Sequence, residues 1–369
     1  MWFAGYAPKD IESAIGLAFA PVGRPHYDRV RRNVDSLADR LGQDALPLPL
    51  PAKGCLVESL SAQQKRALDE ALHPVYAMQT AAQQDRLRQI QIDECDEPMV
   101  PLGPHLDREK VDASFSVGHF HDACGSWAGR RRVFWVRREV AEKFAMVCRA
   151  IGDIGVHAHV EDCWRPWQVQ KGLFIRRTLR IARDFPTWSW QDVKRVTSSL
   201  TAPSPGLAGH QAGAAIDWRM RTNDADRTFL DLGNEYAEGG VAAALDSPYI
   251  TAVQWETRMY FLHAMRLAGF RLLFTEDWHA SHGDRGMGMD RSITMRRARY
   301  GPIDRFRADD GAVTRYVSRF VEQDFLTDAQ LQELIAMSRE KTDKRYTHPS
   351  FQLYERFLGE EEKHKTWKI

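Results

Sequence analysis

The sequence contains little cysteine, and its cysteines form no metal-binding or redox motif. Cys55, Cys95, Cys124, Cys148 and Cys163 are an odd number and widely scattered, without a Cys-x-x-Cys pair. Structural zinc sites and thiol redox centres use closely spaced cysteine pairs, so neither is expected from these residues. Scattered single cysteines suit a reducing compartment, and we expect a cytoplasmic protein.

Long apolar runs and an excess of charge of one sign are also absent. The longest apolar stretches are broken by Arg, Lys or Pro before they reach the roughly 18–20 residues of a transmembrane helix, so no membrane span is expected. The apolar stretch Ala14–Ala20 follows two acidic residues, a pattern that disfavours a secretory signal. The formal charge is +1, which argues against nucleic acid or an acidic membrane surface as a partner.

The remaining composition is that of a globular protein that folds in water. Of the 369 residues, 43% are hydrophobic and 27% charged, which excludes fibrous and mostly disordered classes. At about 150 residues per domain, this length fits two to three domains or one large domain with an extension. The texture of the chain predicts a helical N-terminal extension at 1–112, an α+β domain at 113–300 and a helical C-terminal extension at 301–369.

Helical periodicity and stop signals predict several elements in the extensions. Residues 27–41 are expected as an amphipathic helix and 46–51 as an extended proline-rich connector. A capping box predicts a helix over 61–73, and a Gln- and Arg-rich stretch is expected to continue as helix to Ile92. In the C-terminal extension, Thr327-x-x-Gln330 predicts a second capping box at the start of a helix.

The central segment alternates short β-like runs with helices. The expected strands are Val133–Val136, Val156–Val160 and the apolar run Phe270–Phe274. The expected helices are one whose apolar face runs from Val140 to Ile151, one at Trp167–Asp184 and one at Ala252–Ala268 that ends at Gly269.

Two polar clusters in apolar surroundings predict a metal site. His210 and Asp217 are seven residues apart, about 10 Å along a straight helix, which is too far to share an ion with bonds near 2 Å. Small residues such as Gly213 allow the segment to turn, so that a strand carrying Asp217 passes close to His210. With His279 as the third ligand, two imidazoles and one carboxylate leave an open position, the arrangement of catalytic zinc.

Two further residues are candidates for catalysis. Glu276 lies three residues before His279 and is the candidate general base that takes a proton from a metal-activated water. Arg165 follows an alternating strand and stands between Trp164 and Pro166, so its guanidinium is expected to be fixed near the metal and to stabilise an oxyanion.

These residues together resemble the VanX-type zinc D-alanyl-D-alanine dipeptidases and carboxypeptidases, within the lysostaphin, D-Ala-D-Ala peptidase and hedgehog fold group. The similarity runs from about Arg130 to Arg285. The segments that carry it, in order, are Asp162-Cys-Trp-Arg-Pro-Trp-Gln-Val-Gln170, His210-x-x-Gly213-x-Ala215-x-Asp217, Asp231-Leu-Gly233, the stretch Arg258–Phe270, Glu276-Asp-Trp-His279 and Ser281-His-Gly-Asp-Arg285.

The resemblance implies a fold, a site and a substrate class. The fold would be α+β, with a small, mainly antiparallel sheet flanked by helices carrying the site. His210, Asp217 and His279 would hold Zn²⁺, while Glu276 and Arg165 would act on a small peptide or amide substrate such as D-Ala-D-Ala. The segments outside the similarity are expected to cap the site or to form a homodimer.

The sequence also departs from the family pattern. Ala208 stands where the family has serine, and Trp164 where it has tyrosine. Asp277 replaces the tryptophan that usually follows the glutamate. This added carboxylate is expected either to change the charge preference for the substrate or to raise the pKa of Glu276 by like-charge repulsion.

Other interpretations of the same residues remain open. Two histidines and one carboxylate also suit Fe²⁺ in a non-haem iron enzyme. A third possibility is a non-catalytic zinc-binding module of the same fold, although a purely structural zinc needs neither Glu276 nor Arg165.

The remaining conspicuous residues have structural interpretations. His157 and His159 are interpreted as a partly buried packing pair, and His119-x-His121-Asp122 as part of a loop or strand edge. The basic runs Arg130–Arg132 and Arg296–Arg297 are interpreted as solvated. Cys163 is expected to be a buried small hydrophobe.

Overall fold

A computed structural model describes most residues from 77 to 340. The larger stretches outside the description are 1–76, 117–131, 238–240, 291–293, 318–320, 341–369 and 251–263 except residues 254, 257 and 258. The expected elements at 27–41, 46–51 and 61–73 lie outside the described residues, as does the His119–Asp122 cluster.

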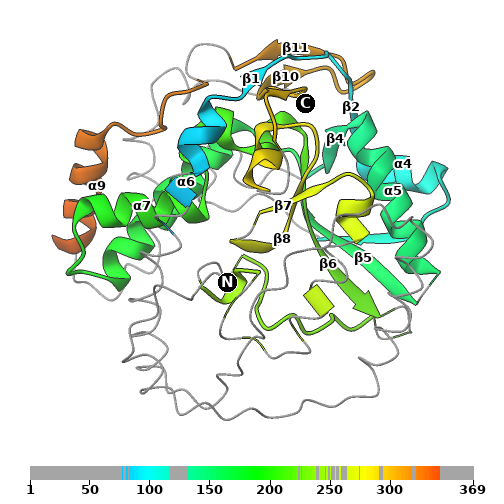
Figure 1. Ribbon diagram of the computed structural model, residues 1–369, viewed down its shortest axis with the longest axis horizontal. Helices are drawn as coiled ribbons and strands as arrows, with labels where there is room; N and C mark the ends of the chain where they lie inside the picture. Colours follow the sequence, from blue (N-terminus) through cyan, green and yellow to red (C-terminus); the bar gives the residue numbers. More distant parts are fainter. Residues whose placement is uncertain are drawn as a thin grey trace.

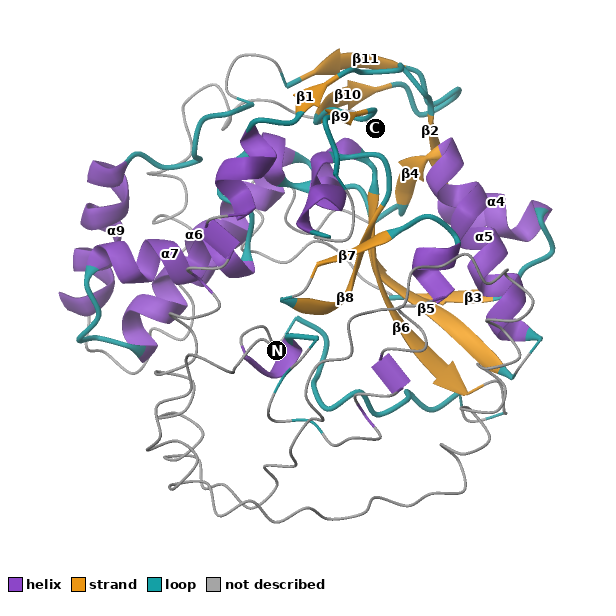
Figure 2. Cartoon of the chain, viewed as in Figure 1, coloured by secondary structure: helices purple, strands orange, loops and turns teal. Residues whose placement is uncertain are grey.

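The chain is a mixed α+β protein (Figures 1 and 2). No described helix is long and apolar enough to cross a lipid bilayer. The strands are β1 (Gln91–Ile92), β2 (Met99–Pro101), β3 (Ala113–Phe115), β4 (Trp135–Arg137), β5 (Val156–Asp162), β6 (Ala215–Thr222), β7 (Arg271–Leu273), β8 (Glu276–Ser281), β9 (Arg297–Ala298), β10 (Ile303–Phe306) and β11 (Val313–Tyr316). The α-helices are α4 (Leu102–Arg108), α5 (Arg138–Gly152), α6 (Trp167–Asp184), α7 (Trp190–Leu200) and α9 (Asp328–Glu340). Short 3-10 helices are η2 (Pro205–Leu207), η3 (Gly209–Ala212), η4 (Val241–Ala243) and η5 (Arg285–Met289).

The largest sheet has five strands in the order β3-β5-β6-β8-β7. The β3–β5 pair is parallel, and the other three pairs are antiparallel. Its central strands β5 and β6 are buried along almost their whole length, in keeping with their β-branched and aromatic side chains. The sheet therefore brings residues near 162, 217 and 279 into adjacent strands.

One face of this sheet is covered by α5, which lies beside α4 in Figure 1. The helix is amphipathic, and Val140, Phe144, Val147 and Ile151 on its apolar face are buried in the main hydrophobic core. Phe144 meets Trp218 of β6 edge to face, with ring centroids 5.8 Å apart. This packing fixes the sheet from one side.

A second core lies between α6, α7 and α9, on the other side of the view in Figure 1. The Ser189 hydroxyl caps α7 by accepting a hydrogen bond from the Asp192 amide. At the start of α9, Thr327 and Gln330 form the predicted capping box: the Gln330 amide donates to the Thr327 hydroxyl, and the Thr327 amide donates to the Gln330 side chain.

Several predicted elements are confirmed. The helix ending at Gly152, the helix Trp167–Asp184 and the strand beginning at Val156 are α5, α6 and β5. The strand expected at 133–136 is shifted to Trp135–Arg137, and the run after Gly269 contains β7. In the predicted helix at 252–268, the described residues 254, 257–258 and 264–267 are helical.

The expectation of wholly helical extensions is wrong at both ends. Strands β1 and β2 lie before residue 112, and the hairpin of β10 and β11 lies beyond residue 301. These strands are only two to four residues long, so neither a period of 2 nor a period of 3.6 stands out in them. They pair with distant segments, β1 with β9 and β2 with β4, and a sequence pattern does not reveal such partners.

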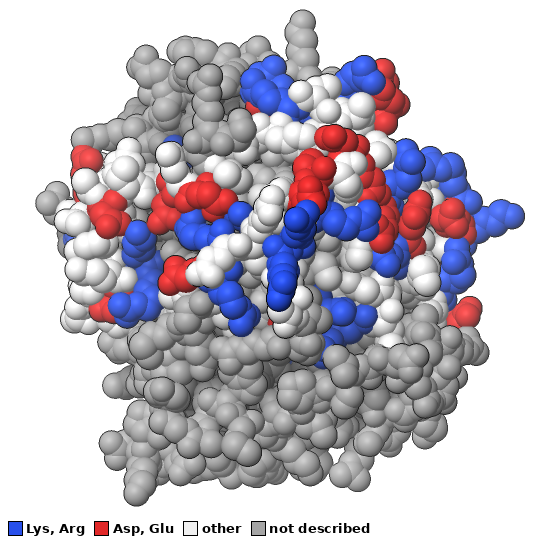
Figure 3. All heavy atoms as spheres, turned by 45° about the horizontal axis from the view of Figure 1, so that its top comes forward, with Lys and Arg blue, Asp and Glu red and all other residues white. Residues whose placement is uncertain are grey.

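Charged side chains of both signs lie next to one another on the face drawn in Figure 3. The balance of acidic and basic residues in the sequence is thus visible as neighbouring patches on this face.

Candidate metal centre

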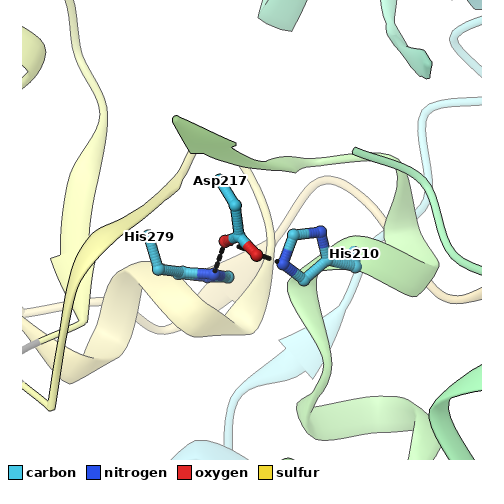
Figure 4. A group of neighbouring side chains, drawn as sticks. All are labelled: His210, Asp217 and His279. Atoms are coloured by element: carbon cyan, nitrogen blue, oxygen red, sulfur yellow. Dashed lines mark hydrogen bonds and ion pairs between the residues drawn. The ribbon is translucent and has the colours of Figure 1, made fainter. Parts of the chain in front are cut away.

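The three predicted metal ligands come together from three elements (Figure 4). His210 lies in η3, Asp217 on β6 and His279 on β8, and the last two are directly opposed across the strand pair. One ligand atom from each lies within 4.8 Å of those of the other two, and all three side chains are buried. This buried His-Asp-His group can hold a metal ion.

A left-handed turn returns the chain from His210 to Asp217. Gly213 ends η3 with φ +69°, a backbone conformation that favours glycine, and its amide donates to the His210 carbonyl. Gly209 is also tightly enclosed, because a Cβ there would lie 2.6 Å from an Asp284 carboxylate oxygen and 2.7 Å from the Ser281 hydroxyl. The two glycines thus permit the turn that the seven-residue spacing requires.

The two carboxylate oxygens of Asp217 have different surroundings. Oδ1 lies 3.1 Å from Nε2 of His210 and 2.9 Å from Nδ1 of His279. Oδ2 accepts a hydrogen bond of 3.0 Å from the Tyr236 hydroxyl, and the Arg165 guanidinium is 3.4 Å away. Oδ1 is therefore directed at the two imidazoles, while Oδ2 points to the donors of Tyr236 and Arg165.

The hydrogen bonding of His210 favours a cation between it and Asp217. Its Nδ1 lies 2.6 Å from the Cys163 carbonyl, which only accepts, so Nδ1 carries the proton. Burial and the nearby Arg165 lower the pKa of His210, which favours the neutral ring. Its Nε2 is then an acceptor facing the acceptor Oδ1, and a metal ion satisfies both atoms.

The contacts among His210, Asp217 and His279 also determine the protonation of Asp217 and His279. Burial opposes ionisation of Asp217, but His210 and His279 outweigh it and hold the pKa of the carboxyl well below its usual range. Burial lowers the pKa of His279, yet the hydrogen bond with Asp217 and the charges of Asp217 and Glu276 leave it above its ordinary value. Asp217 is thus an anionic ligand at neutral pH.

Arg165 is fixed beside this group by the residues of its own sequence motif. Its guanidinium donates to Asp162 at 2.9 Å and to the Gln170 side chain at 2.8 Å. Asp162 also pairs with Arg132 at 2.6 Å and lies opposite Asp217 in the β5–β6 register. The spacing of Asp162, Arg165 and Gln170 is explained by this network, in which Asp162 and Gln170 orient the guanidinium.

Glu276 lines the same cavity as the three ligands. One of its carboxylate oxygens lies 4.0 Å from Nδ1 of His279. A regular strand directs residues three apart to opposite faces, but the β7–β8 register shifts between Leu272 and Leu273, so both side chains face the cavity. Burial raises the pKa of Glu276 to about 7, so it exchanges a proton near neutral pH.

The site opens into a cavity of about 450 Å³. Besides the ligands, Glu276 and Arg165, the walls include Arg132, Tyr236, Ser281 and the arginines of α6. The Ser281 hydroxyl lies 3.1 Å from Nε2 of His279, so it fixes the ring from the side away from Asp217. A cavity of this size accommodates a small organic substrate.

Asp277 does not act on Glu276 as the sequence predicted. Its carboxylate is turned away from the cavity and pairs with the fully buried Arg258 at 3.1 Å, and it accepts a hydrogen bond from Asn234. Burial and the charge of Asp217, not Asp277, oppose ionisation of Glu276. Asp277 and Arg258 are therefore a buried structural pair.

Sequence reasoning missed Tyr236 and misjudged Arg132. Arg132 is not simply solvated, since it pairs with Asp162 and lines the cavity, whereas Arg297 is exposed as expected. Tyr236 follows the predicted Asp231-Leu-Gly233 segment, and the turn at Gly233, with φ +85°, precedes it. No sequence pattern identifies Tyr236 or Arg132 as a site residue, because only the folding of the chain places them beside the cavity.

The structure agrees with the structural roles predicted for His157, His159 and Cys163. His157 and His159 are buried on β5, where His159 contacts Ser114 at 2.7 Å and His157 contacts Arg227. Cys163 is 1% exposed, and burial raises the pKa of its thiol. Neither histidine belongs to a metal-ligand group among the described residues.

Comparison with known proteins supplies no assignment for this site. No protein-family model matches the sequence, and no curated protein matches it at a significant level. Conclusions about function therefore rest on the residues and their geometry.

Proposed function

We propose that this protein is a zinc-dependent hydrolase of a small dipeptide or similarly compact amide. The observation that carries the proposal is the buried group of His210, Asp217 and His279 with the carboxylate of Glu276 facing the same cavity. A structural zinc site is closed by four protein ligands and needs no adjacent base, whereas this group has three ligands and a carboxylate of raised pKa.

The donor set fits zinc. Two imidazole nitrogens and one carboxylate oxygen are common ligands of catalytic zinc, and the outer partners of each ligand are already in place. When bound, zinc lowers the pKa of a water molecule and polarises a substrate carbonyl. Iron is the alternative metal for the same ligands.

Three residues of the chain have separate roles in the proposed hydrolysis. Glu276 accepts a proton from the attacking water and returns it to the leaving amine. Arg165, oriented by Asp162 and Gln170, donates hydrogen bonds to the oxygen that becomes negative as the carbonyl is attacked. Tyr236 holds the outer oxygen of Asp217, so the inner oxygen keeps its direction.

The family assignment is part of the same proposal. The motifs that resemble the VanX-type dipeptidases contribute ligands, base and arginine to one cavity, and this convergence supports membership of that fold group. The mainly antiparallel sheet β3-β5-β6-β8-β7 carries Asp217 and His279, as such a fold requires. D-Ala-D-Ala is accordingly the first substrate to test.

The decisive experiment combines metal analysis with a substrate panel. The purified full chain is assayed for zinc and iron by mass spectrometry and for amino-acid release from D,D-, L,D- and L,L-dipeptides. We expect one zinc per chain and hydrolysis of at least one dipeptide. Glu276→Gln is expected to keep the metal and to lower kcat by at least about 100-fold, since general base catalysis contributes 10²–10⁴-fold.

The matched control is Glu109→Gln, which removes an exposed carboxylate at the end of α4. It is expected to leave both metal and turnover unchanged. Turnover that survives Glu276→Gln would remove the proposed base, and iron with oxygen consumption would replace the hydrolase by an oxygenase.

A further inference from the structure

A row of arginines on α6 faces the cavity that contains the metal centre. Arg176, Arg180 and Arg183 are spaced i, i+4 and i+7 on one side of the helix, Arg177 lies about 100° further round, and all four line the cavity. The opposite side of α6 carries Phe174 and other apolar residues of the core shared with α7 and α9. The basic side of the helix is thus turned to the cavity by the packing of its apolar side.

Glu276 is the cavity carboxylate whose charge acts on Arg177, while Asp162 and Asp217 are engaged elsewhere. Asp162 is paired with Arg132 and Arg165, and Asp217 is directed at Arg165 and the two histidines. Within the part of the chain that the structure describes, neither Arg176 nor Arg177 has a carboxylate within ion-pair distance. Arg176 and Arg177 therefore present positive charge to the cavity without a direct ion pair to any described carboxylate.

Arg177 gives the clearest sign that a ligand belongs here. Its Nη1 atom is buried and has no hydrogen-bond partner among the described residues. A buried donor without a partner costs about 1–3 kcal/mol, and more when it is charged. Burial and repulsion from Arg180 lower the pKa of Arg177 to about 10, so the group still carries its charge at neutral pH.

We propose that Arg176 and Arg177 form a subsite for an anionic group of the substrate, a phosphate or a carboxylate, away from the bond that is cleaved. The proposal rests on the proposed function for the cleaved bond, but the subsite itself needs no metal. Arg177 lies two helical turns, about 10 Å, beyond Gln170, which holds Arg165. A substrate that reaches both regions is an amide with an anionic group several bonds from the carbonyl carbon.

Guanidinium groups suit this role better than other side chains. Their planar fork donates paired hydrogen bonds to the two oxygens of a carboxylate or phosphate, and they remain charged when partly buried. Arg176 and Arg177 leave the helix in different directions, but both line the same cavity, so their long side chains can contact one such group together. The substrates favoured by this subsite are therefore amides that carry an anionic group, such as acidic dipeptides and phosphorylated amides, rather than neutral dipeptides.

The test is direct binding of small anions to the full chain, measured by isothermal titration calorimetry. Inorganic phosphate and succinate are titrated into the wild type, into Arg176→Gln/Arg177→Gln and into Arg108→Gln, which removes an exposed arginine of α4. Each protein is measured after chelator treatment and again with one equivalent of zinc. We expect at least one of the two anions to bind the chelator-treated wild type, the double variant to bind it at least about tenfold more weakly, and the control to be unchanged.

These outcomes separate the subsite from the proposed function. Binding that is lost in the double variant and retained without zinc supports the subsite even if no dipeptide is hydrolysed, and the tighter anion identifies the preferred group. Binding of neither anion, binding that survives in the folded double variant, or binding that appears only with zinc would overturn the proposal. Circular dichroism of the double variant establishes that it is folded.

Discussion

At the residue scale, the behaviour of the site depends on the two oxygens of Asp217. Oδ1 points to His210 and His279, and Oδ2 is engaged by Tyr236 and Arg165. Hydrogen bonds to the outer side of a ligand fix its direction and commonly change metal affinity by 10–100-fold. Tyr236 should therefore matter for the metal even though it is not a ligand.

Replacing Tyr236 by phenylalanine tests this role. Tyr236→Phe is expected to weaken zinc binding about tenfold, because Oδ2 loses a hydrogen-bond donor while the ring is kept. Competition with a chromophoric chelator measures the affinity. Tyr316→Phe is the matched control, since its hydroxyl donates to the exposed Asp96 on another part of the molecule. Equal affinities of the two variants would show that Oδ2 needs no such donor.

At the scale of elements, the site depends on two irregularities in otherwise regular structure. The left-handed turn at Gly213 returns the chain from η3 into β6. The register shift between β7 and β8 allows Glu276 and His279 to face one cavity. Regular elements alone would have separated these groups.

Gly213→Ala is expected to damage stability and metal binding together. The left-handed conformation costs a residue with a Cβ about 1–2 kcal/mol, and here that Cβ would also lie 2.6 Å from the Met99 side chain. We expect a loss of at least about 1 kcal/mol in chemical denaturation and weaker zinc binding. Gly152→Ala is the control, because a Cβ there meets nothing within 4 Å. A variant Gly213→Ala as stable as Gly152→Ala would contradict this account of the turn.

Some elements of this fold can be predicted from the local sequence, and others cannot. Helices α5 and α6 have long apolar faces, and α9 begins at a capping box, so local residues define them. The hairpin of β10 and β11 was missed because Ile303–Phe306 and Val313–Tyr316 have only four residues each and no clear alternation of apolar and polar residues. β1 and β2 were missed for a different reason, because each pairs with a segment far along the chain, β9 and β4.

The candidate site likewise contains residues that the sequence predicts and residues that only the fold reveals. His210, Asp217 and His279 were predicted from their residue types and spacing together with the family resemblance, and they do lie together. Tyr236 and the cavity side of α6 were not predicted, since only the packing of the helix decides which arginines line the cavity. Asp277 was misjudged because the direction of its side chain depends on the buried Arg258.

At the scale of the whole molecule, the predicted N-terminal extension is joined to the central segment. Leu102 and Leu106 of α4 belong to the main core, and Met99 packs against Gly213. Arg137 is fully buried and donates to Glu94, to the Glu97 carbonyl and to the Ala212 carbonyl at the end of η3. The region before residue 112 thus contributes to the core and supports the turn that carries His210.

This coupling predicts that the segment 113–300 does not fold alone. Without residues 94–111 the core loses Leu102 and Leu106, and Arg137 would be a buried charge without its carboxylate, each a loss of several kcal/mol. Since domains are stable by only about 5–15 kcal/mol, we expect no cooperative thermal transition for the segment. A sharp transition like that of the full chain would show that 113–300 is an independent domain.

The central claim is that His210, Asp217 and His279 bind one metal ion, and anomalous X-ray diffraction of zinc-soaked crystals tests it most directly. At the zinc absorption edge we expect a single strong peak among Nε2 of His210, Oδ1 of Asp217 and Nδ1 of His279, and no peak there in crystals of His279→Ala. Diffraction data that show no peak among these three atoms, or the main peak at other residues, would contradict the metal centre and the hydrolase built on it.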